Sequence, residues 1–210
     1  MSVLTLYRAE PAQSKSHNPL DRRPPQNVPY VVDNLWEWAR PTEWPSRRGC
    51  EYASPDPVSA LKSAGNKPGL HVFGLYFKPG TTALQIAESD AKEHSDIKPN
   101  PSRKMILVKA LFELLKPGSD SPYPSWASQP LPLKLAAAPL FLPVLSRDEL
   151  DALLGAGGPL AGIAKQLRKE VAFWSSAKLI DFGATGLPNG IGEVFFQAGS
   201  VERKELVEGV

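Results

Sequence analysis

Proline is the residue that most limits how this chain can fold. The sequence has 22 prolines among 210 residues, about twice the usual frequency, and they fall in clusters. A proline fixes its own φ, lacks an amide donor and pushes the preceding residue away from the helical region. We therefore expect few long helices and a chain that is extended or turning over much of its length.

The remaining composition is that of a globular chain. Apolar residues make up 42% of the sequence, enough to bury a core, and the length suits a single domain over residues 1–210. The net charge of +2 does not make a nucleic acid or an anionic membrane the default partner. One cysteine and three dispersed histidines predict neither an internal disulfide nor a metal site.

Apolar runs long enough for a membrane span do not occur, and the N-terminus lacks the basic and then apolar pattern of a signal peptide. We therefore expect no membrane insertion. The expected location is the cytoplasm, or a destination reached by a delivery route without a cleaved signal peptide.

Local patterns predict an α+β class, because strand patterns dominate both ends of the chain and helical patterns fall between them. The predicted strands cover residues 3–9, 50–53, 69–78, 177–182 and 193–197, with a short strand or turn at the start of 81–100. The predicted helices cover residues 31–40, 57–64, 102–115, 147–154 and 159–173. A long polar loop is expected over residues 10–30, and a mobile loop is expected in the later part of 81–100.

Helix starts carry recognisable capping residues. Asp33 or Asn34 is expected to cap the helix over 31–40, and Ser54 or Asp56 the helix over 57–64. Ser146 and Glu149 have the spacing of a capping box.

Two stretches are unusually rich in large apolar side chains. Trp36, Trp38 and Trp44 lie within nine residues, either as a cover over the core or as an aromatic wall of a ligand pocket. Residues 118–145 interleave prolines with apolar residues, so we expect this segment to be ordered. It should pack through Trp126, Leu131, Leu133, Leu140 and Phe141.

Three polar residues lie at the ends of predicted strands: Arg8, Ser54 and Glu193. Glu193 follows Gly190-Ile191-Gly192 and opens an apolar run, and a junction of loop and strand often presents a reactive side chain. Each residue also has an ordinary interpretation. Arg8 could form an ion pair, Ser54 could cap a helix, and Glu193 could lie at the exposed start of a strand.

The order and surroundings of these residues resemble the ADP-ribosyltransferase superfamily, specifically its arginine–serine–glutamate type. The three matching pieces are Leu6-Tyr7-Arg8-Ala9, Glu51-Tyr52-Ala53-Ser54-Pro55 and Gly192-Glu193-Val194-Phe195-Phe196-Gln197-Ala198-Gly199. The resemblance implies two small packed β-sheets with a central cleft, flanked by short helices. It implies NAD as a substrate and mono-ADP-ribosylation of a protein or, less readily, a nucleic acid, in the manner of a bacterial toxin or effector. A cognate inhibitor protein is a further implied partner.

The resemblance also implies roles for individual residues. Arg8 would clamp the pyrophosphate of NAD, because a guanidinium matches phosphate oxygens with a fixed fork. Glu193 would hold the ribose and stabilise the positive charge that develops as nicotinamide leaves. Ser54 would fix the Glu193 carboxylate and contact NAD. Tyr7, Tyr52 and Trp36 are the aromatic candidates for contact with NAD, with Tyr52 or a tryptophan stacked on the nicotinamide ring.

The sequence departs from this family at two positions. The family often has Glu or Gln two residues before the catalytic Glu, where this chain has Ile191, so plain NAD hydrolysis stays open beside transfer. The serine motif is Tyr-Ala-Ser, and Tyr52 could match a related branch that uses an aromatic residue on this strand.

Two other functions stay open at this stage. One is a non-catalytic protein-binding module that uses the Pro/Trp-rich surfaces, and the other is an RNA phosphotransferase-like member of the same fold. Five arginines form a basic cluster in the sequence: Arg22, Arg23, Arg40, Arg47 and Arg48. If the chain acts on NAD or RNA, we expect this cluster near phosphate; if it does not, we expect the cluster on a solvated face.

Overall fold

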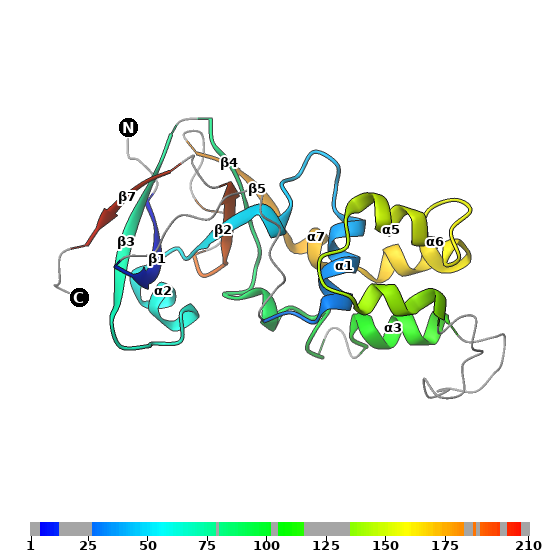
Figure 1. The fold of residues 1–210 in the computed structure, drawn as a ribbon. Coiled ribbons are helices and arrows are strands. Elements are labelled where there is room, and N and C mark those ends of the chain that lie inside the picture. Colours follow the sequence, from blue (N-terminus) through cyan, green and yellow to red (C-terminus); the bar gives the residue numbers. More distant parts are fainter. Residues whose placement is uncertain are drawn as a thin grey trace. The chain divides into compact units, whose positions relative to one another are not determined.

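The computed structural model describes residues 5–12, 27–78, 80–101, 105–115, 135–182, 187, 190–197 and 201–206. The described residues gather into two compact units (Figure 1), and the single domain expected over residues 1–210 stays a prediction. The sheet unit comprises the described residues of 1–23, 43–93 and 176–210. The helical unit comprises those of 24–42 and 94–175.

Two small antiparallel sheets form the sheet unit, which confirms the predicted α+β class and the predicted pair of sheets. The first sheet has the order β1–β3–β7, with β1 Thr5–Pro11, β3 Leu70–Phe77 and β7 Val201–Glu205. The second sheet has the order β2–β6–β4–β5, with β2 Cys50–Ala53, β6 Val194–Gln197, β4 Thr82–Gln85 and β5 Lys178–Asp181.

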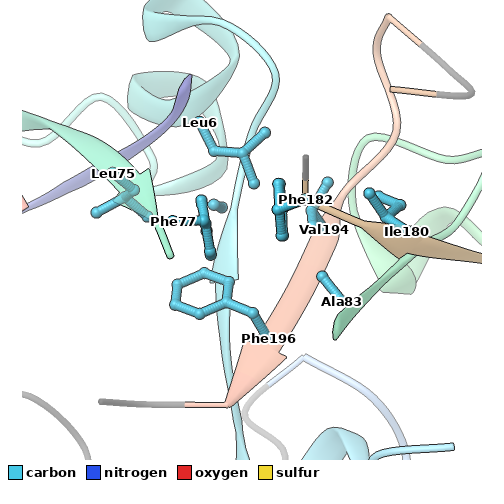
Figure 2. Packing of buried hydrophobic residues seen from close by; sticks show 9 residues of the cluster. Leu6, Leu75, Phe77, Ala83, Ile180, Phe182, Val194 and Phe196 are labelled. Carbon is cyan, nitrogen blue, oxygen red and sulfur yellow. The ribbon is translucent and has the colours of Figure 1, made fainter. Parts of the chain in front are cut away.

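Apolar side chains from both sheets point toward one another and form one core (Figure 2). Phe77 of β3 stacks on Phe182 with 3.9 Å between ring centroids, and Phe196 of β6 meets Phe77 edge-on at 4.9 Å. Residues two apart on a strand share a face, which is why Val194 and Phe196 both enter this core. The sheets therefore pack against each other as predicted, while the predicted cleft between them stays a prediction.

Short helical segments connect the strands of the sheet unit: η1 Arg47–Gly49, α2 Pro57–Ser63 and η2 Ala91–Glu93. The Asp56 side chain accepts the Ser59 amide at 2.9 Å, and Pro57 occupies the first turn of α2. Of the two capping residues predicted for this helix, Asp56 is therefore the cap and Ser54 is not.

The helical unit contains α1 Tyr30–Ala39, α3 Leu107–Leu114, η4 Ala138–Phe141, α5 Arg147–Leu154, α6 Ala161–Glu170 and α7 Phe173–Ser176. Helix α1 contacts α3, η4 and α5, and α6 contacts both α3 and α5 (Figure 1). The fully buried side chains of this unit include Leu35, Trp36, Leu107, Leu111, Leu140, Leu150, Leu167 and Phe173.

Helix ends in this unit test the predicted caps. The Ser146–Glu149 capping box is confirmed at the start of α5. The cap expected at Asp33 or Asn34 is wrong, because α1 begins after Pro29 and contains both residues. Asn34 instead uses its buried amide to bind the carbonyls of Leu140 and Leu142, both at 2.8 Å.

Several other predictions differ from the structure in their bounds or fall partly outside the described residues. Strand β7 was not predicted, and α3 begins at Leu107, five residues later than expected. In the proline-rich segment, Leu140 is buried but Phe141 is 39% exposed. Trp126, Leu131 and Leu133 lie outside the described residues, as do residues 13–26 of the predicted loop. Among the helices that the structure describes, none has the length and apolar character needed to cross a membrane.

Candidate active site

Glu193 lies immediately before β6, where the segment that follows β4 encloses it. Its amide donates to the Glu88 carbonyl at 2.8 Å, and its carbonyl accepts the Ile86 amide at 3.0 Å. The carboxylate Oε2 accepts the Ala91 amide at 3.1 Å. Only 9% of the residue is exposed. Residues 86–91 therefore hold both the backbone and the carboxylate of Glu193, which corrects the ordinary interpretation of an exposed strand-start residue.

Burial raises the pKa of the Glu193 carboxyl from its ordinary value of 4.5 to about 7, because the charged form loses hydration. The positive charge of Arg47 opposes this increase in pKa, and the negative charge of Asp90 adds to it. The Ala91 amide and the Lys92 charge make smaller contributions that lower the pKa. Near neutral pH the carboxyl therefore populates both protonation states, a property that is frequent at catalytic sites.

Gly192 allows the close approach that encloses Glu193. A methyl group on Gly192 would lie 1.9 Å from the Ile86 carbonyl oxygen, so any larger residue would push the two segments apart. The Gln85 side chain also donates to the Gly192 carbonyl at 3.0 Å. The second glycine of Gly190-Ile191-Gly192 is thus required by tertiary packing, whereas Ile191 is 62% exposed.

Tyr52 and Arg47 form a second structured part of the site. Tyr52 lies opposite Phe195 in the β2–β6 ladder, and its hydroxyl donates to the Arg47 carbonyl at 2.9 Å. The Arg47 guanidinium lies 5.1 Å from the centre of the Tyr52 ring, a cation–π contact. Arg47 is only 5% exposed. Its positive charge also lowers the pKa of Glu193.

Ser54 and Tyr7 lie where the two sheets meet. Their backbones exchange two hydrogen bonds, from the Tyr7 amide at 2.9 Å and from the Ser54 amide at 2.8 Å. Ala53 pairs with Val194 at the end of the β2–β6 ladder, and the next residue, Ser54, is buried. The expected contact of Ser54 with Glu193 stays a prediction.

Arg8 forms ion pairs within the sheet unit. Its Nε lies 3.0 Å from Glu10 Oε2, and its Nη1 donates to Glu51 Oε2 at 2.9 Å. Arg203 of β7 pairs with the same two acids. Its Nη1 lies 2.6 Å from Glu10 Oε1, and its Nη2 contacts Glu51 Oε2. Glu51 is fully buried, so these cations offset the cost of burying its charge. The ordinary ion-pairing interpretation of Arg8 is therefore the one that these contacts support.

Strand alternation separates this ion-pair network from the Glu193 site. Glu51 lies opposite Phe196, whose ring enters the core between the sheets. Tyr52, the next residue, lies opposite Phe195 and faces the other side of the ladder. Because Arg8 is directed toward Glu51, its predicted role as a phosphate clamp beside Glu193 stays a prediction that the contacts do not favour.

Trp36 belongs to the core of the helical unit. It is 1% exposed, its ring stacks on Phe173 at 3.9 Å between centroids, and its indole N–H donates to Asp96 at 2.8 Å. Trp38 is also buried. Both residues therefore belong to the core, which is one of the two alternatives that the sequence left open. We withdraw the predicted contact of Trp36 with NAD.

Two charged residues that act on Glu193 were not predicted beside it. Arg47 was part of a basic cluster expected near phosphate or on a solvated face, and Asp90 lay in a segment expected to be a mobile loop. The signal for Arg47 was its position just before the Tyr52 strand. We find no local signal in the sequence for Asp90, because its position depends on the pairing of β4 with β6.

Comparisons with protein-family models, curated proteins and solved structures found no significant match to this chain. Within the part of the chain that the structure describes, no group of three or more His, Cys, Asp or Glu residues is arranged to hold a metal ion.

Proposed function

We propose that this chain is an NAD-dependent ADP-ribosyltransferase that can also pass the ADP-ribosyl group to water as an NAD glycohydrolase. The observation that carries the proposal is the buried carboxylate of Glu193 at the start of β6, held at Oε2 by the Ala91 amide. The ADP-ribosyltransferase-like arrangement of two packed sheets is part of the same proposal, and it draws on the sequence resemblance.

The proposed chemistry uses the ionised form of Glu193. The bond between the ribose anomeric carbon and the nicotinamide nitrogen breaks, and its electron pair leaves with nicotinamide. A carboxylate beside the resulting oxocarbenium-like centre stabilises its positive charge, as in glycoside cleavage. Burial supports this role, since a charge interaction is stronger where water is excluded.

The pyrophosphate contact proposed from the resemblance is Arg8, which would exchange its contacts with Glu10 and Glu51 for the phosphate. Arg47 is a second candidate, because its guanidinium lies against the Tyr52 ring and its charge lowers the pKa of Glu193. Tyr52 retains its proposed role as the aromatic residue near nicotinamide, and Ser54 its role beside Glu193.

The acceptor in the transferase reaction is proposed to be a protein side chain, with a nucleic acid as the less favoured acceptor. A toxin or effector role, with a cognate inhibitor protein as partner, follows from the resemblance. The alternative is a non-catalytic binding module; among the described residues, Trp36, Trp38 and Trp174 are buried and so do not form its surface.

Nicotinamide release tests the proposed function. The parent protein is incubated with NAD, and free nicotinamide is separated by chromatography and quantified. Glu193→Gln keeps the size of the side chain but removes its charge, so nicotinamide release should fall about 100-fold, equivalent to roughly 3 kcal/mol. Glu202→Gln is the matched control, because the Glu202 side chain is 68% exposed on the edge strand β7, and it should keep the parent rate.

Two results would contradict the proposed function. One is a parent protein that neither binds NAD nor releases nicotinamide, which would favour the binding-module alternative. The other is a folded Glu193→Gln variant that consumes NAD at the parent rate, which would remove Glu193 from the chemistry.

A further inference from the structure

Two arginines of the helical unit meet at the C-terminal end of α1. Arg147, the first residue of α5, donates from Nη1 to the carbonyls of Glu37 and Arg40, both at 3.0 Å. Arg168, near the end of α6, donates from Nη2 to the Trp38 carbonyl at 3.5 Å. Helix α5 contacts both α1 and α6 (Figure 1). Because Glu37 and Trp38 are consecutive residues, whose Cα atoms lie about 3.8 Å apart, these contacts hold the two guanidinium groups close together.

An aromatic ring fixes the Arg168 guanidinium in addition to the carbonyl. Its central carbon, Cζ, lies 4.3 Å from the centre of the Trp38 ring, a cation–π contact. Trp38 itself is 3% exposed, so its ring is a rigid platform. A planar guanidinium that lies on such a ring keeps its orientation, and little further ordering is needed when its outer N–H groups bind a ligand.

Arg147 and Arg168 have one carboxylate partner between them. Arg147 Nε lies 3.8 Å from Asp151 Oδ2, and the Asp151 side chain is 54% exposed. Among the described residues, Arg168 has no carboxylate partner of its own. The nearby carboxylate of Glu37 is bound by Arg40 at 3.0 Å. The pair of guanidinium groups therefore carries excess positive charge.

This charge is unfavourable in the absence of an anion. Loss of hydration lowers the pKa of the Arg168 guanidinium, and the positive charge of Arg147 lowers it further, whereas the negative charge of Asp151 raises it. A cation with a lowered pKa lies where its surroundings disfavour the charged form. An anion between the two guanidinium groups would offset this effect, because it attracts both of them.

Each guanidinium also has N–H groups that can bind such an anion. Nη2 of Arg147 and both Nε and Nη1 of Arg168 have no hydrogen-bond partner in the part of the chain that the structure describes. The Arg147 side chain is 30% exposed, and Arg168 is exposed, so a ligand can reach both. The two oxygens of a carboxylate lie in one plane and match a single guanidinium. The oxygens of phosphate point in several directions, so that two guanidinium groups from different helices can bind it together.

We propose that Arg147 and Arg168 form a binding site for a phosphate group at the C-terminal end of α1. The ligand is either free phosphate or a phosphate ester, since both present the same oxygens. Recognition depends on the phosphate alone, because the Trp38 ring is buried and already carries Arg168. The site lies in the helical unit, whereas Glu193 lies in the sheet unit, so this inference does not depend on the proposed function.

Isothermal titration calorimetry of the full chain with inorganic phosphate, at pH 8 and constant ionic strength, tests the site. Saturable binding of one phosphate per chain is expected. Arg168→Gln should weaken this binding at least about tenfold, the equivalent of one lost hydrogen bond to a charged group. Lys169→Gln is the matched control, because this exposed residue of α6 loses the same charge outside the site, and it should bind as the parent does.

Phenyl phosphate, titrated in the same way, distinguishes the two sources of the phosphate group. Tighter binding of phenyl phosphate than of inorganic phosphate indicates an ester as the ligand, and equal or weaker binding indicates the free ion. Glu193→Gln should bind inorganic phosphate with the affinity of the parent. Inactivity toward NAD and loss of the phosphate site are therefore separate results.

Three results would overturn the inference. The first is inorganic phosphate that binds no more tightly than acetate at the same ionic strength. The second is a folded Arg168→Gln variant that keeps the parent affinity, and the third is equal weakening in Lys169→Gln. Arg168→Lys keeps the charge without the planar fork, so it should also bind phosphate more weakly, and it repeats the test if Arg168→Gln does not fold. If neither variant folds, Arg168 is a structural residue and the inference is rejected.

Discussion

Glu193→Gln should remove a pH dependence from the stability of the protein. In the parent, burial raises the folded-state pKa of Glu193 to about 7 from an ordinary 4.5. A group whose pKa rises on folding contributes stability that is fully present below the unfolded-state pKa and is lost as pH rises through the folded-state pKa. Glutamine has no such titration, and its side-chain carbonyl can still accept the Ala91 amide.

The size of the effect follows from the two pKa values. Raising a pKa from 4.5 to about 7 corresponds to a loss of about 3 kcal/mol in the free energy of unfolding between pH 4 and pH 8. Most of this loss should occur between about pH 5 and pH 7, where the unfolded chain is ionised and the folded chain is still protonated. The stability of Glu193→Gln relative to the parent should therefore increase by about 3 kcal/mol over this range.

Urea unfolding followed by circular dichroism, repeated at pH steps from 4 to 8, measures this difference. Other titrating acids, including Asp56 with its lowered pKa, are present in both proteins and cancel in the comparison. Glu202→Gln, which removes a carboxyl from an exposed side chain, is the control for the substitution itself. A Glu193→Gln difference that stays constant across this pH range would refute the burial argument, whatever the protein does with NAD.

Three further predictions concern the same structure. Nicotinamide release should fall about tenfold for each pH unit below pH 7, because the ionised fraction of Glu193 falls by that factor; a rate profile flat from pH 5 to pH 7 would contradict it. Gly192→Ala should destabilise the protein by at least about 2 kcal/mol, since its methyl group would meet the Ile86 carbonyl at 1.9 Å; an unchanged melting temperature would refute this. Asn34→Ala should cost about 2–3 kcal/mol in urea unfolding, because three backbone groups lose a buried partner; a loss below about 0.5 kcal/mol would contradict it.

Elements that depend on neighbouring residues were predictable from the sequence. Strand β2 has the predicted bounds Cys50–Ala53, and the capping box at Ser146 and Glu149 is present. Both depend on contacts within a few residues, such as strand alternation or a side chain that binds an amide three positions away. Strand β7 was missed because Val-Glu-Arg-Lys-Glu is mostly charged, and its pairing with β3 connects residues more than a hundred positions apart.

For the candidate site, local patterns were enough to predict that Glu193 opens an apolar strand after a glycine-rich turn and that Tyr52 lies near the end of another strand. Tertiary structure decided which charges surround Glu193. The pairing of β6 with β2 and β4 brings residues 86–91 around its carboxylate and Arg47 within electrostatic reach, and it directs Arg8 toward Glu51. Local patterns record which residues favour a strand, whereas burial and charge depend on distant segments that meet only when the chain folds.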